Sequence, residues 1–204
     1  MIVAENILEK ADNLFHKYGV RSISMDDIAR ELGISKKTIY QYFKDKDDIV
    51  YQMTQRRIEI DKNEFSKAYE SSEDAIDELI KVSVCLRKNL NRVNPALLFD
   101  IQKYHPRSWD LWIDYKNNYI RNYVLKSIER GKREGFFRST LDAETLATFR
   151  IETVQMSFDD RIFPHDKFNF TEVQMTLFDH FVHGLLTVKG HEIYQNLIKS
   201  QVNV

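Results

Sequence analysis

The sequence is poor in cysteine, glycine and proline, and each scarcity narrows the choice of fold. Its 204 residues include one cysteine, Cys85, which excludes an intramolecular disulfide and the zinc sites that need several cysteine ligands. Cys85 lies in an apolar stretch and is interpreted as core filler. The six glycines and three prolines are few for a protein of many short strands and tight turns, so the composition favours long helices.

Long apolar segments and an excess of charge of one sign are also missing. No segment approaches the roughly 18 uncharged apolar residues of a membrane span. The N-terminus carries Glu5 and Glu9 and lacks a signal-peptide pattern. We therefore expect a cytoplasmic protein with no membrane partner. The formal net charge is -1, so any nucleic-acid binding must come from a local basic patch.

The sequence predicts a first helix that ends at Gly19. Two short helices with capping residues are predicted directly after it. Ser24 is expected to cap the first of them with Asp27 as its capping-box partner, and Ser35 is expected to cap the second. Gly33 supplies the turn between them. Two capped helices joined by a turn of about three or four residues that contains glycine predict a helix-turn-helix.

The rest of the chain shows helical periodicity. Asp45 is expected to cap the next helix, and Thr171 with Gln174 is interpreted as a later capping box. The tail from His191 is expected to be a short helix or frayed. The predicted fold class is all-α, with about nine helices in total. Those after the two short ones are placed at about 45–69, 72–90, 107–133, 142–158 and 171–188.

The second of the two short helices lies in the most basic segment of the chain. Residues 35–46 hold four lysines and one aspartate, a charge of +3, so the remaining residues sum to -4 (-1 minus +3). In a helix-turn-helix, the second helix enters the major groove. A lone lysine cluster is more often a solvated helix face. Joined to two capped helices and a glycine turn, it favours double-stranded DNA as the partner.

Residues 11–50, about a fifth of the chain, resemble the TetR family of bacterial regulators. The resemblance lies in Ala-x-x-Leu-Phe-x-x-x-Gly from Ala11 and in a longer run from Ser24, Ser-Met-Asp-Asp-Ile-Ala-x-x-Leu-Gly-Ile-Ser-Lys-Lys-Thr-Ile-Tyr-x-Tyr-Phe-Lys-x-Lys-x-Asp-Ile. The remainder is similar to the family only in length, helix count and the turn at 131–138. The resemblance implies a DNA-binding head, residues 1–45, and a helical ligand-binding and dimerisation body, residues 46–204.

The resemblance also implies which residues meet DNA. Ser24 would touch a phosphate, and Lys46 would bind one through its amide and its ammonium. Lys37 stands where many relatives have glycine or alanine, so we hypothesise that it reads a base or adds a phosphate contact. The implied DNA-binding residues are Ser24, Ser35, Lys36, Lys37, Thr38, Tyr40, Gln41, Tyr42 and Lys46. The implied function is a transcriptional repressor that binds a palindromic operator as a homodimer.

The last long helix carries a broad apolar stripe, and the resemblance implies that the last two long helices form the dimer interface. Gly184 would let a second helix approach closely. Alternatively, the stripe is ordinary core of one chain. His180 and His183 share a helix face, but no third ligand is apparent, so no metal site is predicted. The predicted interface residues are Val173, Leu177, Phe178, Phe181, Gly184 and Leu185.

Aromatic residues are concentrated in the middle of the chain, where the resemblance implies a cavity for a small-molecule inducer. An aromatic lining suits a flat or apolar ligand. Glu152 or Lys116 would orient a polar end of that ligand. Alternatively, the aromatic residues only pack the core. The candidate pocket residues are Phe99, Trp109, Trp112, Tyr115, Tyr119, Phe149, Glu152 and Met156.

Two other functions compete with a ligand-released repressor. A DNA-binding protein of the same fold with no inducer would act through protein partners and would have a filled core. A helical enzyme is the second rival. However, the chain has no zinc-protease helix motif, no P-loop and no Gly-x-Ser-x-Gly. We therefore expect no enzymatic activity and no cofactor.

Overall fold

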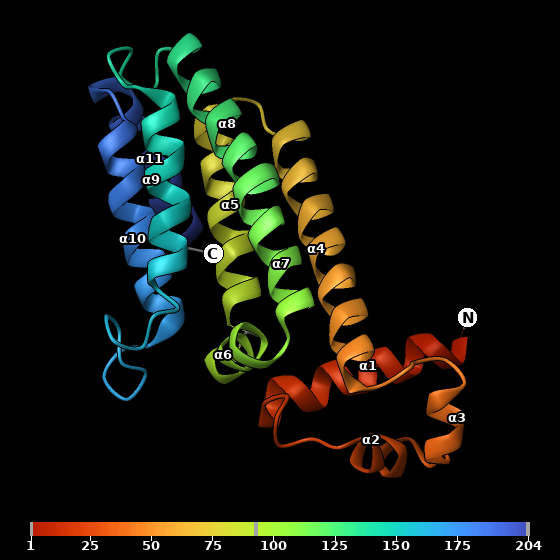
Figure 1. The fold of residues 1–204 in the computed structure, drawn as a ribbon. Helices are drawn as coiled ribbons and strands as arrows, with labels where there is room; N and C mark the ends of the chain where they lie inside the picture. The colour runs from red at the N-terminus through yellow and green to blue at the C-terminus, as the bar shows by residue number, and fades with distance from the viewer. Residues whose placement is uncertain (1, 92–93, 203–204) are drawn as a thin grey trace. The chain divides into compact units, whose positions relative to one another are not determined.

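The structure, a computed structural model, describes residues 2–91 and 94–202 and confirms the all-α prediction (Figure 1). These residues form eleven α-helices and one π-helical segment, and no strand occurs among them. A single isolated bridge joins Phe137 to Leu186. Because α7, the π segment η1 and α8 follow one another in the sequence without a gap, they are counted as one helical segment, so the number of separate helices is close to the predicted nine.

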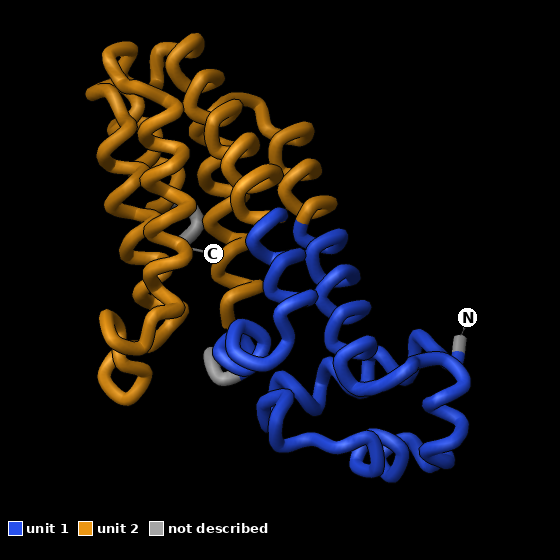
Figure 2. The backbone as a smooth tube through the Cα atoms, viewed as in Figure 1, with its two compact units in different colours: residues 1–61, 92–114 blue, residues 62–91, 115–204 orange. Residues whose placement is uncertain are grey.

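The chain divides into two compact units, drawn in different colours in Figure 2. Unit 1 comprises residues 1–61 and 92–114, and unit 2 comprises residues 62–91 and 115–204. One division falls inside helix α4 (Lys46–Glu70), and the last one falls where α7 gives way to η1. The predicted boundary near residue 45 concerns which residues bind DNA, and it stays a prediction.

Unit 1 is built around the three N-terminal helices. They are α1 (Ile2–Tyr18), α2 (Met25–Leu32) and α3 (Lys36–Tyr40), and they are joined by the first part of α4, by α6 (Pro95–Tyr104) and by α7 (Pro106–Asp114). Apolar side chains of these helices and of the segments between them form its core. The side chains that are almost completely buried there are Ile7, Ala11, Phe15, Val20, Ile28, Ile39, Phe43, Ile49 and Val50.

Unit 2 consists of longer helices packed around a second core. Besides the rest of α4 it contains α5 (Ala75–Leu90), η1 (Tyr115–Ile120), α8 (Arg121–Arg133), α9 (Ala143–Met156), α10 (Phe170–Leu185) and α11 (Val188–Val202). Helix α10 packs on α5 and on α9, and α8 packs on α9. The most deeply buried apolar side chains of this core are Ile76, Ile80, Ile128, Phe137, Val182, Leu185 and Leu186.

The helix predicted over 107–133 is interrupted by a π turn. The backbone is α-helical to Asp114, π-helical over Tyr115–Ile120 and α-helical again to Arg133. A π turn widens the helix by one residue and is not visible as a change of apolar period. Its effect here is to bury Tyr115 and the neighbouring Lys116 together.

Three predictions of helix ends are wrong in detail. Asn169, not Thr171, caps α10, because its side chain accepts from the Glu172 N–H at 3.1 Å while Thr171 is buried. Helix α5 begins at Ala75, after the cap at Asp74. The tail forms α11, a helix of 15 residues, whereas a short or frayed segment was predicted. At α5 and α10 the helix begins after a neighbouring residue, Asp74 or Asn169, whose side chain accepts the first free backbone N–H groups.

Candidate nucleic-acid interface

The predicted cap of α2 is confirmed by its hydrogen bonds. The Ser24 hydroxyl accepts from the Asp27 N–H at 3.2 Å, and the Ser24 N–H donates to the Asp27 carboxylate at 2.9 Å. The Ser24 hydroxyl also donates to that carboxylate at 2.6 Å, and these bonds lower the pKa of Asp27. Gly33 then ends the helix with φ at 64°, a left-handed conformation that suits glycine. The first half of the motif is therefore built by local interactions.

Helix α3 is short and presents one face to solvent. Its cap is Ser35, whose hydroxyl accepts from the Thr38 N–H at 3.1 Å, as predicted. The Thr38 hydroxyl lies 2.8 Å from that of Ser35, so it is engaged in the cap and half-buried. Ile39 is completely buried in the head core. Burial of this one residue turns the other side chains outward; the exposed ones are Lys36, Lys37, Tyr40, Gln41 and Tyr42.

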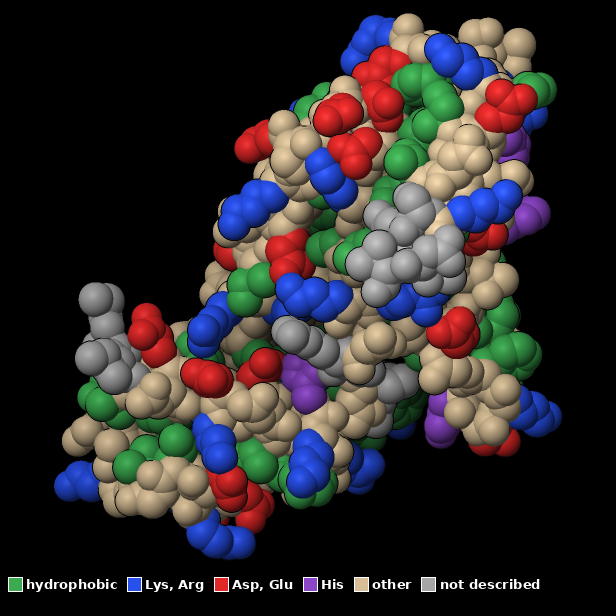
Figure 3. Space-filling model, turned by 180° about the vertical axis from the view of Figure 1, so that it is seen from behind, with side chains coloured by type: hydrophobic (Ala, Val, Ile, Leu, Met, Phe, Trp, Pro, Cys, Tyr) green, Lys and Arg blue, Asp and Glu red, His purple; other side chains and the backbone are tan. Residues whose placement is uncertain are grey.

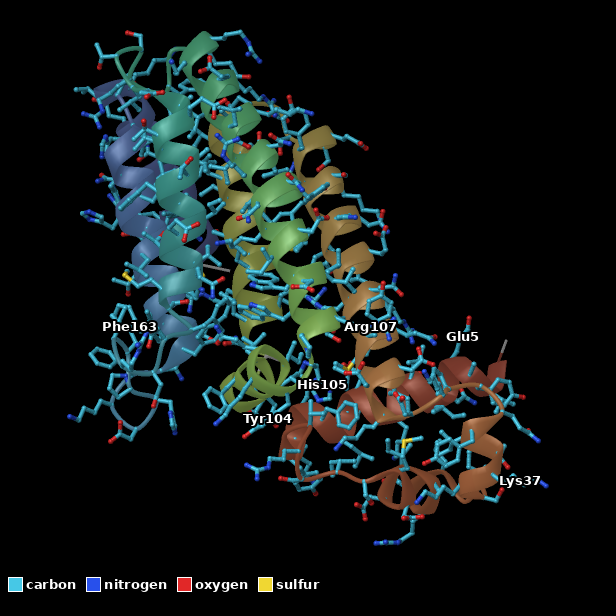
Figure 4. All side chains as sticks on the ribbon, in the orientation of Figure 1. Glu5, Lys37, Tyr104, His105, Arg107 and Phe163 are labelled. Carbon is cyan, nitrogen blue, oxygen red and sulfur yellow. The ribbon has the colours of Figure 1, made fainter. Side chains whose placement is uncertain are left out.

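The two adjacent lysines of α3 differ in their electrostatic partners. The Lys36 ammonium lies 2.9 Å from the Asp26 carboxylate, which raises the pKa of Lys36 and neutralises its charge locally. Within the described part of the chain no carboxylate pairs with Lys37, and Figure 4 shows this side chain extending away from the head. Lys37 is therefore the cation of α3 that is most available to a polyanion.

Lys46 lies at the start of α4, as predicted, but its ammonium is engaged inside the head. It donates to the backbone carbonyls of Val20 and Ile23 at 3.1 and 3.0 Å. The residue is half-buried, and burial lowers its pKa. Lys46 thus ties the loop before α2 to α4. A phosphate contact through the Lys46 amide stays a prediction, whereas its ammonium already has two acceptors.

A second set of contacts in unit 1 joins α6 and α7 to the loop before α2 and to the start of α4. The Arg21 N–H donates to the Asp100 carboxylate at 2.9 Å, and His105 Nδ1 lies 2.7 Å from the Asp47 carboxylate. The Arg107 guanidinium lies over the Tyr51 ring, 4.4 Å from its centroid. Figure 4 labels His105 and Arg107 at the corner between α6 and α7. Sequence reasoning missed these contacts because they join residues 56 to 79 positions apart, for which no local pattern exists.

The predicted interface stripe on α10 is mostly core of the single chain. Four of the six residues, Val173, Phe178, Phe181 and Leu185, are at most 8% exposed in unit 2. Leu177 is half-buried and Gly184 is exposed. Four residues of the stripe are therefore ordinary core of one chain, which was the alternative interpretation. Only the other two lie where a partner chain would reach them. Whether α10 forms a dimer stays a prediction.

The candidate pocket residues are distributed over both units. Phe99, Trp109 and Trp112 belong to unit 1, where Trp109 packs against the head core and Phe99 is 53% exposed. In unit 2, Tyr115 stacks on Tyr119 with ring centroids 5.5 Å apart. The other three, Phe149, Glu152 and Met156, lie on α9 in the same unit, where Phe149 is 50% exposed and Met156 is half-buried.

The two charged residues expected to orient a ligand pair with each other. The Lys116 ammonium lies 2.9 Å from the Glu152 carboxylate, with exposed side-chain fractions of 6% and 58%. A charged residue that sequence reasoning did not select, Arg150, is 5% exposed on the same helix. The signal was present in the sequence, because Arg150 continues the buried helical face formed by Ala143 and Ala147.

The surface is otherwise of mixed charge. On the face drawn in Figure 3, Lys and Arg side chains alternate with Asp and Glu side chains, in keeping with the net charge of -1. No helix in residues 2–91 and 94–202 combines the length and the apolarity that crossing a membrane requires. Among the same residues, no three His, Cys, Asp or Glu side chains gather into a possible metal site.

A capped helix-turn-helix followed by a larger set of long helices is typical of helix-turn-helix DNA-binding proteins. Residues 7–53 match the family model described as bacterial regulatory proteins, tetR family. The chain is 32% identical over 120 residues to an HTH-type transcriptional regulator of Staphylococcus aureus strain USA300. That match covers 54% of this chain and 65% of the relative, just under two thirds of the relative's length.

Solved structures share the whole fold at low identity. A TetR-family regulator from Agrobacterium tumefaciens superposes with a TM-score of 0.72 at 18% identity, over 90% of this chain and 97% of the other. The complex of SmeT with triclosan superposes with a TM-score of 0.70 at 14% identity, over 92% and 93% of the two chains. SmeT is the repressor of a Stenotrophomonas maltophilia multidrug efflux pump. Together these matches support a TetR-family transcriptional regulator.

Proposed function

We propose that the protein is a cytoplasmic transcriptional repressor that binds a palindromic operator as a homodimer and leaves it when a small organic ligand binds. The observation that carries the DNA-binding part is the exposed face of α3. There Lys37 has no carboxylate partner among the described residues, and Tyr40 and Tyr42 are 48% and 43% exposed. Such large aromatic residues on a basic helix are able to donate hydrogen bonds to phosphates and to pack on sugars.

The test of this part begins with the full-length protein and a random duplex pool, from which bound sequences are selected. We expect a palindromic product, because two copies of one head bind half-sites about 34–36 Å apart on one face of DNA. Binding to the selected duplex is then measured against salt concentration. Failure to bind any duplex at low ionic strength would end the proposal.

Lys37→Ala separates the two roles hypothesised for Lys37. If Lys37 binds phosphate, affinity falls on every sequence and the salt slope falls by about 1. If it reads a base, the loss is about 1–3 kcal/mol at one position of the site and discrimination there is relaxed. Lys36→Ala is the matched control, since Lys36 is adjacent but already paired with Asp26, and we expect a smaller loss. A larger loss of DNA affinity for Lys36→Ala than for Lys37→Ala would contradict the assignment of Lys37 as the lysine of α3 that binds DNA.

The second part is a dimer formed by the solvent face of α10. Exposed or half-buried along that face are Thr176, Leu177, His180, His183 and Gly184. On α9, the 50% exposed ring of Phe149 is an apolar group that a partner chain would cover. These residues replace the buried part of the predicted stripe as the proposed contact surface.

Gly184→Ala tests the dimer without disturbing the single chain. A Cβ atom at Gly184 would meet nothing within 4 Å, so one chain accommodates the methyl group. Replacing a helical glycine by alanine even favours the helix by about 1 kcal/mol. We expect the dimer dissociation constant, measured by sedimentation, to rise at least about tenfold because the methyl group holds the partner helix away. An unchanged constant would place the interface elsewhere.

The third part, release by a ligand, is supported at the level of the fold. A protein of the same fold is solved with triclosan, an aromatic ligand. In unit 2 the stacked rings of Tyr115 and Tyr119 lie within the π-helical segment, a type of helix irregularity that often accompanies functional sites. For release, the ligand must bind the DNA-incompetent state more tightly than the DNA-bound state.

A further inference from the structure

Arg150 is a buried cation with almost no polar partner. It lies on α9 and is 5% exposed. Its guanidinium has five N–H donors. One terminal nitrogen donates to the Thr153 hydroxyl at 3.5 Å, the upper limit for such a bond. The guanidinium carbon also lies 5.3 Å from the centroid of the Phe178 ring on α10, within the range of a cation–π contact.

The other buried charges of unit 2 are compensated, and Arg150 is not. Lys116 pairs with Glu152 at 2.9 Å. Buried Glu78 pairs with Arg130 at 3.2 Å and accepts a hydrogen bond from Ser127. No carboxylate in the described part of the chain lies within ion-pair distance of Arg150. Burial alone lowers the pKa of Arg150, to about 10, and no neighbouring acid raises it. The group therefore still carries its charge at neutral pH.

An uncompensated charge in a protein core is unfavourable, so such groups are nearly always paired. We propose that Arg150 binds the carboxylate of a small, otherwise apolar organic acid inside unit 2. We further propose that this acid is the ligand to which the regulator responds, a step that rests on the proposed function.

The surroundings of Arg150 indicate the kind of acid. A planar guanidinium matches a carboxylate through two parallel N–H···O bonds. One arginine compensates one negative charge, which favours a monoanion over a phosphate dianion. The neighbouring Phe178 ring is 5% exposed and belongs to the apolar core, so it would contact a hydrocarbon part of the ligand. The Thr153 hydroxyl already donates to the Arg150 carbonyl at 2.7 Å, so the guanidinium itself would supply the N–H donors for both carboxylate oxygens.

The experiment compares two acids with their neutral counterparts on the full-length protein. The probes are octanoate and benzoate, with octan-1-ol and benzyl alcohol as controls. Binding is measured by calorimetry and by the shift in Tm at millimolar concentration. We expect at least one acid to raise the Tm by about 2 °C or more, and its alcohol to do so by clearly less.

Arg150→Met separates loss of the site from loss of the fold. Methionine has a similar length and no charge, and replacing a buried ion by an apolar side chain is often neutral or stabilising. We therefore expect the Tm of the unliganded variant to equal or exceed that of the wild type, while acid affinity falls about tenfold to a hundredfold. Arg121→Met is the matched control: Arg121 is paired with Glu144 and its side chain is 32% exposed, so acid binding should be unchanged.

The outcomes distinguish this proposal from the function it rests on. Equal binding of acid and alcohol, equal acid affinity of wild type and Arg150→Met, or no binding of either acid would overturn the carboxylate site. If the wild type nonetheless binds its selected duplex, the proposed DNA-binding function stands. If an acid binds through Arg150 and the duplex affinity is the same with and without it, the site stands and the ligand response fails.

Discussion

Helix α3 in unit 1 and helix α9 in unit 2 both carry cations, but they use them in opposite environments. On α3 the lysines are exposed, and the one ion pair, Lys36 with Asp26, has side chains 44% and 61% exposed. On α9 the cation Arg150 is 5% exposed, and Glu152 reaches a lysine whose side chain is 6% exposed. Exposed charges cost little in folding and remain available to DNA, whereas buried ones bind strongly only what compensates them.

This comparison teaches that burial, not charge, decides what a substitution does. An exposed lysine on α3 should affect the binding of a polyanion without affecting stability. Removing the partner of a buried cation in unit 2 should lower the stability of the chain.

The largest effect is expected from removing the carboxylate that faces the buried lysine. Glu152→Ala removes the acceptor 2.9 Å from the Lys116 ammonium while that lysine stays buried. The free energy of unfolding, measured by urea denaturation, should fall by about 2–3 kcal/mol.

Glu144→Ala is the matched control for this substitution. Glu144 is also a glutamate on α9 with a side chain 58% exposed, but its partner Arg121 is 32% exposed. The expected loss is below about 1 kcal/mol, as for a surface pair. Equal losses of unfolding free energy for the two glutamate substitutions would contradict the idea that burial of the partner determines how much an ion pair stabilises the fold.

An intermediate effect is expected at the cap of α2, where backbone hydrogen bonds rather than charges stabilise the head. Ser24→Ala removes the acceptor of the Asp27 N–H and should lower the free energy of unfolding by about 1 kcal/mol. Ser24→Asn keeps a capping side chain and should recover most of the loss, and Lys37→Ala should change stability by less than about 0.5 kcal/mol. A larger loss of stability on replacing Lys37 would contradict the expectation that exposed lysines of α3 contribute little to stability.

The smallest effect is expected from a partly exposed pair on α1. Asp12 raises the pKa of His16 above its ordinary 6.5 through a side-chain hydrogen bond, and the two side chains are 43% and 26% exposed. Because the folded state binds the proton more tightly, the stabilisation is complete below about pH 6.5 and is lost as the pH rises through the raised pKa.

For such a partly exposed pair, we expect the stabilisation that it contributes to fall by less than about 1 kcal/mol between pH 6 and pH 8. The measurement is the difference in unfolding free energy between the wild type and Asp12→Asn at the two pH values. A difference that grows as the pH rises would reverse the sign and contradict the assignment to His16.

Several features of the head were predictable from the sequence because they depend on neighbours in the chain. The caps at Ser24 and Ser35 involve residues three positions apart, and the buried position of Ile39 follows from the helical period. The exposed lysines of α3 follow in turn, since one buried residue on a short helix directs the others outward. The fold class could be predicted for the same reason: helical periodicity is a local property.

The engagement of Lys46 and the lack of an acidic partner for Arg150 among the described residues were not predictable in this way. The carbonyls that accept from Lys46 lie more than twenty positions earlier in the chain. Arg150 lies on an apolar helical face in the sequence, but only the packing of α10, with Phe178, shows that no acid covers it.

The sequence was sufficient to predict that the fold is all-α, that Ser24 and Ser35 cap α2 and α3, and which short helix offers lysines to a polyanion. These features depend only on hydrogen bonds and side-chain spacing over three or four residues. The tertiary structure alone decided which charges are buried and which are compensated, and that the long middle helix contains a π turn. Charge pairing depends on residues that come into contact only when helices far apart in the sequence pack together. A local sequence pattern does not show such contacts.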